Sequence, residues 1–382
     1  MTGDAHGGAS KNGGASKNGS AGRHGTAHGS TAHDSTAHDS TTHDSTAHDR
    51  AVHDRALGAF AGLALGDALG MPTQSMSPRE IAEDYGDLDG LAAAGPRQRI
   101  AAGMPAGSVT DDTEQAVLLA ELLIEHDGHL PADEFARRLL TWERDMIAKD
   151  SLDLLGPSTK AALQRLQDGE DPATTGQGGS TNGAAMRVTP VGIAVPFAPR
   201  TPFLDAVQDS ARITHNSSLG LAAAAAVGAA VSAGIDGATA AEAVAIGADY
   251  ADLAERRAHW AAGGRIGPRV RWAAALLRDA DPADHARLLI DLVGTSVAAQ
   301  ESVVAALALA AASTDPWTTL RTAARAGGDT DTVAAMAGAV LGAVHGAAAW
   351  PADALAVLQD RNRLDLVSLC TGLLAVRERR RI

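Results

Sequence analysis

The sequence has a single cysteine and very few aromatic residues. Cys370 is the only cysteine in 382 residues, so no intrachain disulfide can form and an oxidising compartment is not indicated. Aromatic residues make up 3% of the chain, whereas hydrophobic residues make up 45% and are mostly Ala, Leu and Val. Strands favour aromatic and β-branched side chains, and closely packed helices accept small ones. The composition therefore favours a helical protein.

Positive charge is also scarce. Lys and Arg number 32 against 46 Asp and Glu, which gives a net charge of −14. Affinity for phosphate backbones comes from clustered Lys and Arg, so we expect no nucleic-acid partner, and the excess carboxylate suits a cation. The N-terminus has no continuous apolar core typical of a signal peptide. The most apolar run, 219–235, is short for a membrane span and predicts a buried helix. We expect no membrane partner and a cytoplasmic location.

Residues 1–55 contain almost no large apolar side chain, so they cannot bury enough surface to offset the entropy of ordering. We expect a disordered tail over 1–55, followed by one domain over 56–382. From residue 28 the tail repeats every five residues and places histidines at His33, His38, His43, His48 and His53. These histidines indicate either a weak zinc or nickel site or a solvated low-complexity extension. Five is not a helical or strand period, which favours the extension.

The rest of the chain is predicted to be all-α, a single compact multi-helix domain. Apolar residues recur at helical spacing at about 112–126 and 131–148, and helix follows helix from about 203 to 379, while strand-like alternation is nearly absent. Two stripes of glycine at every fourth position allow another backbone to approach closely. They are Gly58, Gly62, Gly66 and Gly70, and Gly338, Gly342 and Gly346.

Two acidic turns open apolar helical runs far apart in the sequence. The first reads Thr110-Asp111-Asp112-Thr113, and the second reads Gly328-Asp329-Thr330-Asp331-Thr332. Each turn by itself is explained as a helix cap, because anionic side chains stabilise the first turn of a helix. Each is richer in acid than a cap requires, and four carboxylates near a core repel one another unless a cation compensates. Carboxylate and hydroxyl oxygens are hard ligands, so we expect Mg²⁺ or Mn²⁺ and room for two ions.

A third segment, 175–187, is rich in glycine and in small hydroxyl residues. Its backbone amides are accessible to an anion, but it matches neither the Walker pattern nor the dinucleotide fingerprint. A flexible surface loop explains it equally well.

Together these segments resemble the ADP-ribosylglycohydrolase family over about residues 57–365. The resemblance is carried by GLALGDALG at 62–70, SVTDDTEQA at 108–116, SLDLLGPST at 151–159, GSTNGAAMRVTPVG at 179–192, ITHNS at 213–217 and AGGDTDTVAAMAGAVLGAVHG at 326–346. It implies an all-α domain with a binuclear Mg²⁺ or Mn²⁺ centre, whose ions hold the ribose hydroxyls and orient a water toward the anomeric carbon. The implied substrate is an ADP-ribosylated protein or a small ADP-ribosyl compound.

The same resemblance implies roles for individual residues. Asp112 or Asp331 would activate the water, and Asp153 would assist acid–base chemistry at the ribose. The implied metal ligands are Thr110, Asp111, Asp112, Asp329, Asp331 and Thr332. The implied substrate-binding residues are Gly179, Ser180, Asn182, Gly183, Met186, Arg187 and His215. Without the resemblance, His215 is explained as a hydrogen-bonded core histidine, and Asp67 as a structural residue that accepts from loop amides.

One position departs from the family pattern. Family members often have a glutamate shortly after the proline that follows the glycine stripe, and this chain has Gln74 there. An amide cannot exchange a proton usefully, and Glu80, Glu83 or Asp84 would have to substitute. The linkage cleaved therefore stays open between arginine, serine and cysteine. The alternatives are hydrolysis of a free ADP-ribosyl or nucleoside metabolite, and a non-catalytic ADP-ribose-binding or structural protein on the same fold.

Overall fold

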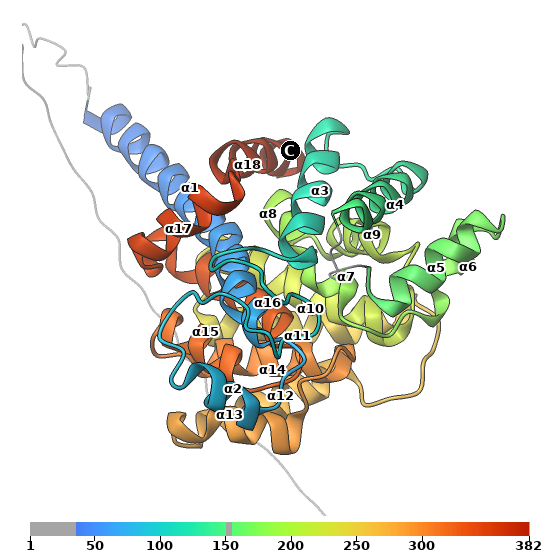
Figure 1. Cartoon of the computed structure of the whole chain (residues 1–382). Helices are drawn as coiled ribbons and strands as arrows, with labels where there is room; N and C mark the ends of the chain where they lie inside the picture. The colour runs from blue at the N-terminus through green and yellow to red at the C-terminus, as the bar shows by residue number, and fades with distance from the viewer. Residues whose placement is uncertain (1–35, 150–154, 382) are drawn as a thin grey trace, which may run out of the picture. The chain divides into compact units, whose positions relative to one another are not determined.

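The computed structural model describes the backbone of residues 36–149 and 155–381, and the chain divides into two compact units, Met1–Ser45 and Thr46–Ile382. The described residues contain helices and three isolated β-bridges but no strand, so the all-α prediction is confirmed (Figure 1).

The first half of the fold contains α1 (Thr36–Gly70), α2 (Pro78–Tyr85), α3 (Asp111–Glu125), α4 (Ala132–Ala148), α5 (Pro157–Gln167), α6 (Pro172–Thr175), α7 (Gly183–Met186), α8 (Thr189–Ala194) and α9 (Arg200–Ala211). The second half contains α10 (Ser218–Ile235), α11 (Ala240–Ala254), α12 (Ile266–Arg278), α13 (His285–Leu288), α14 (Ala299–Ala312), α15 (Pro316–Arg325), α16 (Thr330–His345), α17 (Ala352–Asn362) and α18 (Leu366–Arg381).

Helix α10 lies at the centre of the core. Every residue of this helix from Leu219 to Ile235 is buried, and it packs against α7, α8, α9, α11, α14 and α16. Among the described helices it is the one whose length and apolar composition would suffice to cross a membrane, but protein covers 94% of its residues. A core helix passes the same test, so this feature is weak evidence for a membrane span. The prediction of a buried helix over 219–235 is confirmed.

Helices α1 and α16 run antiparallel with their glycine stripes in contact. A Cβ atom built on Gly62 would lie 2.2 Å from the carbonyl oxygen of Gly338, and one built on Gly58 would lie 2.5 Å from that of Gly342. At the end of α1, a Cβ on Gly70 would lie 2.4 Å from the Cα atom of Asp331. Each stripe therefore allows the backbone of the other helix to approach closely. This glycine contact places the start of α16 against the end of α1.

Helix α1 begins earlier than the sequence analysis predicts. Residues 1–55 were expected to be disordered, but α1 starts at Thr36, and Val52 is buried. The guanidinium of Arg55 donates to the carbonyl oxygen of Ile235 at 3.4 Å, and the carboxylate of Asp54 accepts from the amide of Ala347 at 3.4 Å. These contacts make residues 46–55 part of the folded unit, which therefore begins before the predicted boundary at residue 56. The prediction of disorder over 1–35, including His33, lies outside the described residues.

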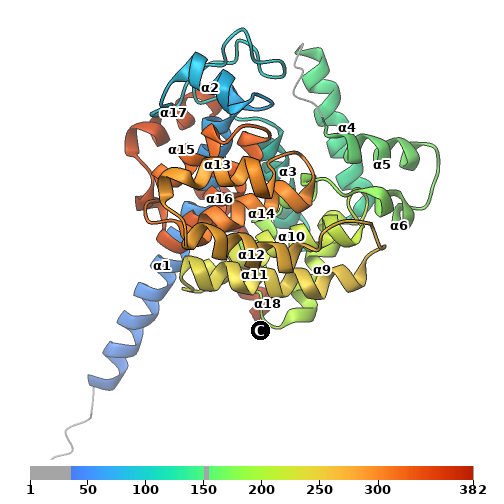
Figure 2. The ribbon, with the colours of Figure 1, turned by 90° about the horizontal axis from the view of Figure 1, so that it is seen from below.

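Helices α4, α5 and α6 lie together at one side of the fold (Figure 2). Helices α4 and α5 are joined to α3 by a second apolar cluster, in which Phe135, Leu139 and Leu163 are buried with Leu122. This flank lies beside α3, and the candidate site is formed where α3, α5, α7 and α16 meet.

Candidate active site

Both acidic turns open helices. Oδ1 of Asp331 accepts from the amide of Thr332 at 2.9 Å, but the side chains at the two N-cap positions are not used as caps. Thr110 is the residue before α3 and Asp329 the residue before α16, and neither side chain bonds to the amides of its own helix. The plain cap interpretation therefore does not account for these residues.

The cap of α3 comes from another helix. The carboxylate of Asp67, on α1, accepts from the amides of Thr110 at 3.0 Å and Thr113 at 3.1 Å, and from both hydroxyl groups. Burial raises the pKa of Asp67 to about 6, against the opposing effect of these four donors. The prediction that Asp67 is structural and binds loop amides is confirmed. Asp67 therefore supplies the cap of α3 from a neighbouring helix.

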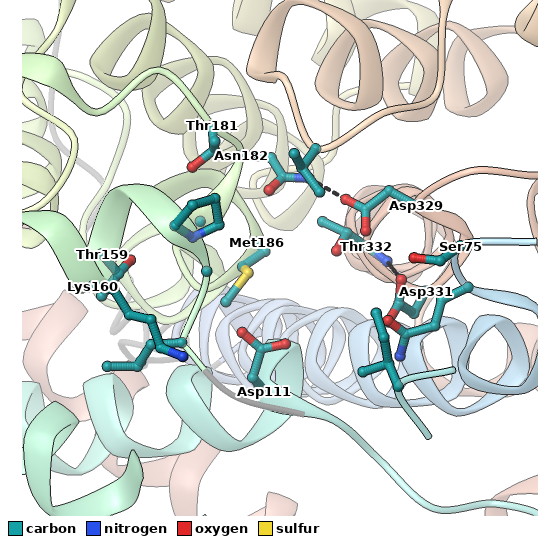
Figure 3. A pocket seen from close by; sticks show the side chains of 17 residues that line it. Ser75, Asp111, Thr159, Lys160, Thr181, Asn182, Met186, Asp329, Asp331 and Thr332 are labelled. Atoms are coloured by element: carbon teal, nitrogen blue, oxygen red, sulfur yellow. Dashed lines mark hydrogen bonds between the residues drawn. The ribbon is translucent and has the colours of Figure 1, made fainter. Parts of the chain in front are cut away.

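The two turns meet at one pocket of about 290 Å³. Asp111 comes from the first turn, and Asp329, Asp331 and Thr332 come from the second (Figure 3). The pocket is also lined by Gln74, Ser75, Ile100, Leu155, Gly156, Pro157, Thr159, Lys160, Thr181, Asn182, Gly183, Met186 and Val297.

Asp112 and Thr110 lie behind this lining. Asp112 is fully buried, and its Oδ2 atom accepts from the hydroxyl of Thr332 at 3.2 Å, which links the two acidic turns directly. Its Oδ1 atom has no hydrogen-bond partner among the described residues. Burial raises the pKa of Asp112 well above its usual value, and Asp331, Asp111, Asp67 and Asp329 raise it further. Burial likewise raises the pKa of Asp329. Such mutual repulsion, with one carboxylate oxygen unsatisfied, fits a divalent cation and its preference for oxygen ligands.

The glycine-rich segment forms the facing wall and is held firmly. The side-chain amide of Asn182 donates to Asp329 and to the hydroxyl of Ser302, and its backbone amide donates to the carbonyl oxygen of Val297 at 3.0 Å. A Cβ atom on Gly179 would lie 2.0 Å from the carbonyl oxygen of Thr214, so only glycine fits there. These contacts exclude the flexible-loop interpretation.

The predicted substrate-binding residues divide into two groups. Asn182, Gly183 and Met186 line the pocket. Gly179, Ser180, Arg187 and His215 do not line it, and Arg187 and His215 are fully buried. Arg187 and His215 therefore lie behind the pocket wall in this structure, and their predicted role in substrate binding stays a prediction. The physical reason is that Arg187, at the end of α7, points into the space between α3 and α9, where it donates to Gln115 and Thr214.

Asp153 lies outside the described residues. The segment that follows it does reach the pocket through Leu155, Thr159 and Lys160. Lys160, whose ammonium group lies 3.2 Å from the carboxylate of Glu143, is a lining residue that the sequence analysis missed. Its one available signal was its place on the helix after Asp153, in a segment already singled out.

Gln74 lines the pocket where the family pattern has glutamate. It is 5% exposed, and its Nε2 atom has no partner among the described residues. The loop is tied to the second acidic turn because the amide of Ser75 donates to the carbonyl oxygen of Gly328 at 2.7 Å. Glu80 is engaged in the cap of α2 and Glu83 in ion pairs with arginines, and neither they nor Asp84 lines the pocket. None of the three replaces the missing glutamate here.

The ADP-ribosylglycohydrolase family model matches residues 48–381. The chain belongs to the ADP-ribosylglycohydrolase family. The match begins at residue 48, in agreement with the early start of the folded unit.

Relatives in this family include both uncharacterised and named proteins. The chain is 34% identical over 326 residues to the uncharacterised protein YegU of Escherichia coli K12, covering 85% of this chain and 97% of YegU. It is 32% identical over 169 residues to the ADP-ribosyl-[dinitrogen reductase] glycohydrolase of Rhodospirillum rubrum, covering 44% of this chain and 53% of that protein. A solved structure described as an ADP-ribosylglycohydrolase-related protein complex matches with a TM-score of 0.65 and 28% identity, covering 86% of this chain and 99% of that one. Membership in the family indicates hydrolysis of the ADP-ribosyl glycohydrolase type.

Proposed function

We propose that this protein is a divalent-metal-dependent hydrolase that cleaves the glycosidic bond between ADP-ribose and a modified protein side chain. The observation that carries the proposal is the meeting of two acidic turns at one pocket, above a buried carboxylate with an unsatisfied oxygen. Such a cluster is costly to maintain without a cation.

The residues that would hold Mg²⁺ or Mn²⁺ are Asp111, Asp112, Asp329, Asp331 and Thr332, with Thr110 beside Asp112. When bound, the metal would neutralise these carboxylates and polarise ligand oxygens. The hydroxyl hydrogen of Thr110 is directed to Asp67, which leaves the oxygen lone pairs of Thr110 for an electrophile.

The reaction places the oxygen of a water molecule on the anomeric carbon as the glycosidic bond breaks, and a proton passes to the leaving group. Asp112 or Asp331 is the group we assign to accept the proton of the attacking water. The surrounding carboxylates also stabilise the positive charge that develops on the ribose in an oxocarbenium-like transition state.

The facing wall is suited to the diphosphate of an ADP-ribosyl group. Asn182 and Gly183 lie on that wall, and Lys160 supplies a positive charge on the side of α5 (Figure 3). Gln74 provides a neutral amide where the family pattern has an acid, so among the described residues no carboxyl group takes the place of that glutamate to protonate a leaving group. A leaving group that departs readily without being protonated by an acid at this position is therefore favoured.

The test uses the full chain and a panel of defined substrates, with peptides ADP-ribosylated on arginine, serine or cysteine and a free ADP-ribosyl metabolite, each with Mg²⁺, Mn²⁺ or a chelator. We expect turnover of at least one peptide that the chelator abolishes. Asp111→Ala and Asp331→Ala should each lower kcat/KM by at least about 10²-fold. Asp353→Ala, which removes an exposed first-turn acid of α17, is the matched control.

Three other outcomes would contradict the proposal. Full activity in Asp111→Ala and Asp331→Ala would remove the acidic cluster from the mechanism. Turnover confined to the free metabolite would assign the protein to small-molecule hydrolysis. Binding of ADP-ribose without turnover of any substrate would make it a non-catalytic binding protein.

A further inference from the structure

A buried arginine behind the pocket has no part in the proposed reaction. Arg187 is 0% exposed, and its guanidinium lies 5.1 Å from the centre of the Phe135 ring. Burial lowers the pKa of Arg187 to about 10, so it is still charged at neutral pH. Its hydrogen bonds among the described residues go to the neutral oxygens of Gln115, Ser210 and Thr214. A buried cation without a directly bonded acid is costly, which calls for a compensating role.

Two chains of hydrogen bonds, which we call arms, start at Arg187. The first arm leads to Asp111, on the acidic side of the pocket. Its Nη1 atom donates to the side-chain oxygen of Gln115 at 3.2 Å, and the side-chain nitrogen of Gln115 donates to Oδ2 of Asp111 at 2.9 Å. Gln115 is 1% exposed and lies one helical turn after Asp111 on α3. Because Arg187 takes the oxygen of Gln115, the amide nitrogen must face Asp111. The arginine thereby fixes which way the Gln115 amide points.

The other arm leads to the facing wall. The Nη2 atom of Arg187 donates to the hydroxyl of Thr214 at 2.7 Å, and that hydroxyl lies 2.9 Å from Nδ1 of His215. The Nε2 atom of His215 lies 2.8 Å from the hydroxyl of Thr181, which lines the pocket. Thr214 and His215 are both 0% exposed, so water does not compete for these bonds.

In this second arm, the direction of each hydrogen bond follows from the bond that Arg187 donates to Thr214. Thr214 accepts from Arg187, and the one other partner of its hydroxyl among the described residues is Nδ1 of His215. A buried hydroxyl that failed to donate would be penalised, so Thr214 donates to Nδ1 and the His215 hydrogen is on Nε2. His215 stays neutral because burial, and then the charge of Arg187, hold its pKa well below its usual value. Thr181 accepts from Nε2–H, and its own hydroxyl hydrogen is left to donate into the pocket.

We propose that Arg187 is a positioning residue that orients Asp111 through Gln115 and, through Thr214 and His215, turns the Thr181 hydroxyl toward an oxygen of the bound ligand. The two endpoints, Asp111 and Thr181, lie on different sides of the pocket in Figure 3. The identity of the ligand oxygen, on the phosphate or ribose of an ADP-ribosyl group, rests on the proposed function. The hydrogen-bond chain itself does not.

The first test compares two buried arginines in the full chain. Arg187→Lys cannot reach both arms with one ammonium group. Arg377→Lys is the matched control, because Arg377 is 2% exposed and donates to Gly192, Ile193 and Ser232, none of which lines the pocket. Nitrogen NMR of ¹⁵N-histidine-labelled protein reports the tautomer of His215, assigned by its loss in His215→Gln. We expect the Nε2–H form in the wild type and in Arg377→Lys, and a mixture of forms in Arg187→Lys.

Calorimetry with ADP-ribose and Mg²⁺ gives a second readout. Arg187→Lys should weaken binding by about 10- to 100-fold, the usual cost of removing a group that orients a ligand-contacting residue, whereas Arg377→Lys should leave it unchanged. Thr181→Val should weaken binding as well, Thr181→Ser should restore it, and Thr181→Val should add little to Arg187→Lys because both interrupt one arm. Thr214→Val serves as a second interruption of the arm if Arg187→Lys does not fold.

An unchanged His215 tautomer in Arg187→Lys or Thr214→Val would overturn the proposal. So would equal losses of affinity in Arg187→Lys and Arg377→Lys, or additive losses in the Arg187→Lys, Thr181→Val double variant. If the wild type itself does not bind ADP-ribose, it is the proposed function that fails, and the tautomer comparison decides the role of Arg187 alone.

Discussion

At the scale of single residues, Asp112 is a proposed metal ligand whose buried charge lowers the stability of the metal-free fold. Its carboxylate is fully buried, close to four other acids, and has one oxygen without a partner among the described residues. In the metal-free protein the ionised form of Asp112 is therefore destabilised in the folded state relative to the unfolded chain.

Replacing this carboxylate with an amide should stabilise the metal-free protein. The folded-state pKa of Asp112 lies above its unfolded value, so the folded protein binds the extra proton and the penalty of the ionised form grows as the pH rises. We expect metal-free Asp112→Asn to melt at a higher temperature than the wild type at about pH 8, with the gap shrinking toward about pH 5.

Calorimetric melting across this pH range, with and without Mg²⁺, checks the prediction. Mg²⁺ should raise the Tm of the wild type much more than that of Asp112→Asn. A variant that is less stable than the metal-free wild type at every pH would show that the repulsion is relieved in some other way.

The sequence predicted some site residues well and others poorly, for a physical reason. The acidic residues could be predicted because a helix start fixes where its first-turn side chains lie. Asp111, Asp329, Asp331 and Thr332 duly reach one pocket. Arg187 and His215 were assigned to the ligand, but the direction in which a buried side chain points depends on tertiary packing. Lys160 gave no local pattern at all.

At the scale of elements, the glycine contact between α1 and α16 places the second acidic turn against the end of α1. The four-residue spacing predicted that some backbone would approach each stripe closely. It could not predict that the two stripes approach each other, because the partner of a helix face is decided by the whole fold. The close approach of Gly62 and Gly338 leaves no room for a methyl group.

Gly338→Ala should therefore destabilise the protein strongly. The added Cβ would lie 2.0 Å from the carbonyl oxygen of Gly62, which is backbone and cannot move aside cheaply. We expect a loss of at least about 2 kcal/mol in the free energy of unfolding. Gly90→Ala is the control, because nothing lies within 4 Å of the added atom and its stability should be unchanged. Chemical denaturation measures both, and equal midpoints would refute the close contact.

At the scale of the whole molecule, the helical class and the single large folded unit were predictable from composition and periodicity. The start of that unit was not, because residues 46–55 contain one large apolar side chain, Val52. Helix α1 extends back through this segment, and Val52, Asp54 and Arg55 then find partners on other helices.

Truncation tests this boundary. A chain that begins at residue 56 loses the burial of Val52 and the bonds of Asp54 and Arg55, so its Tm should be a few degrees lower than that of a chain beginning at residue 46. The second unit of the fold begins at Thr46, so the chain from residue 46 should match the full-length protein. Differential scanning calorimetry of the three proteins measures the difference. Equal Tm values for the two truncated chains would show that residues 46–55 do not stabilise the fold, as a boundary at residue 56 implies.

Helix α1 also determines which half of the pocket can adapt. Asp67 on this helix holds the start of α3, and Gly70 at its end lies against the backbone of Asp331. Both sets of carboxylates are thus held against the same helix, so the distance between them depends on the shape of α1. The acidic half of the pocket is held against α1, whereas Thr159 and Lys160 on the other side come from α5. For the proposed substrates, we expect differences in the size of the modified side chain to be accommodated on the α5 side of the pocket.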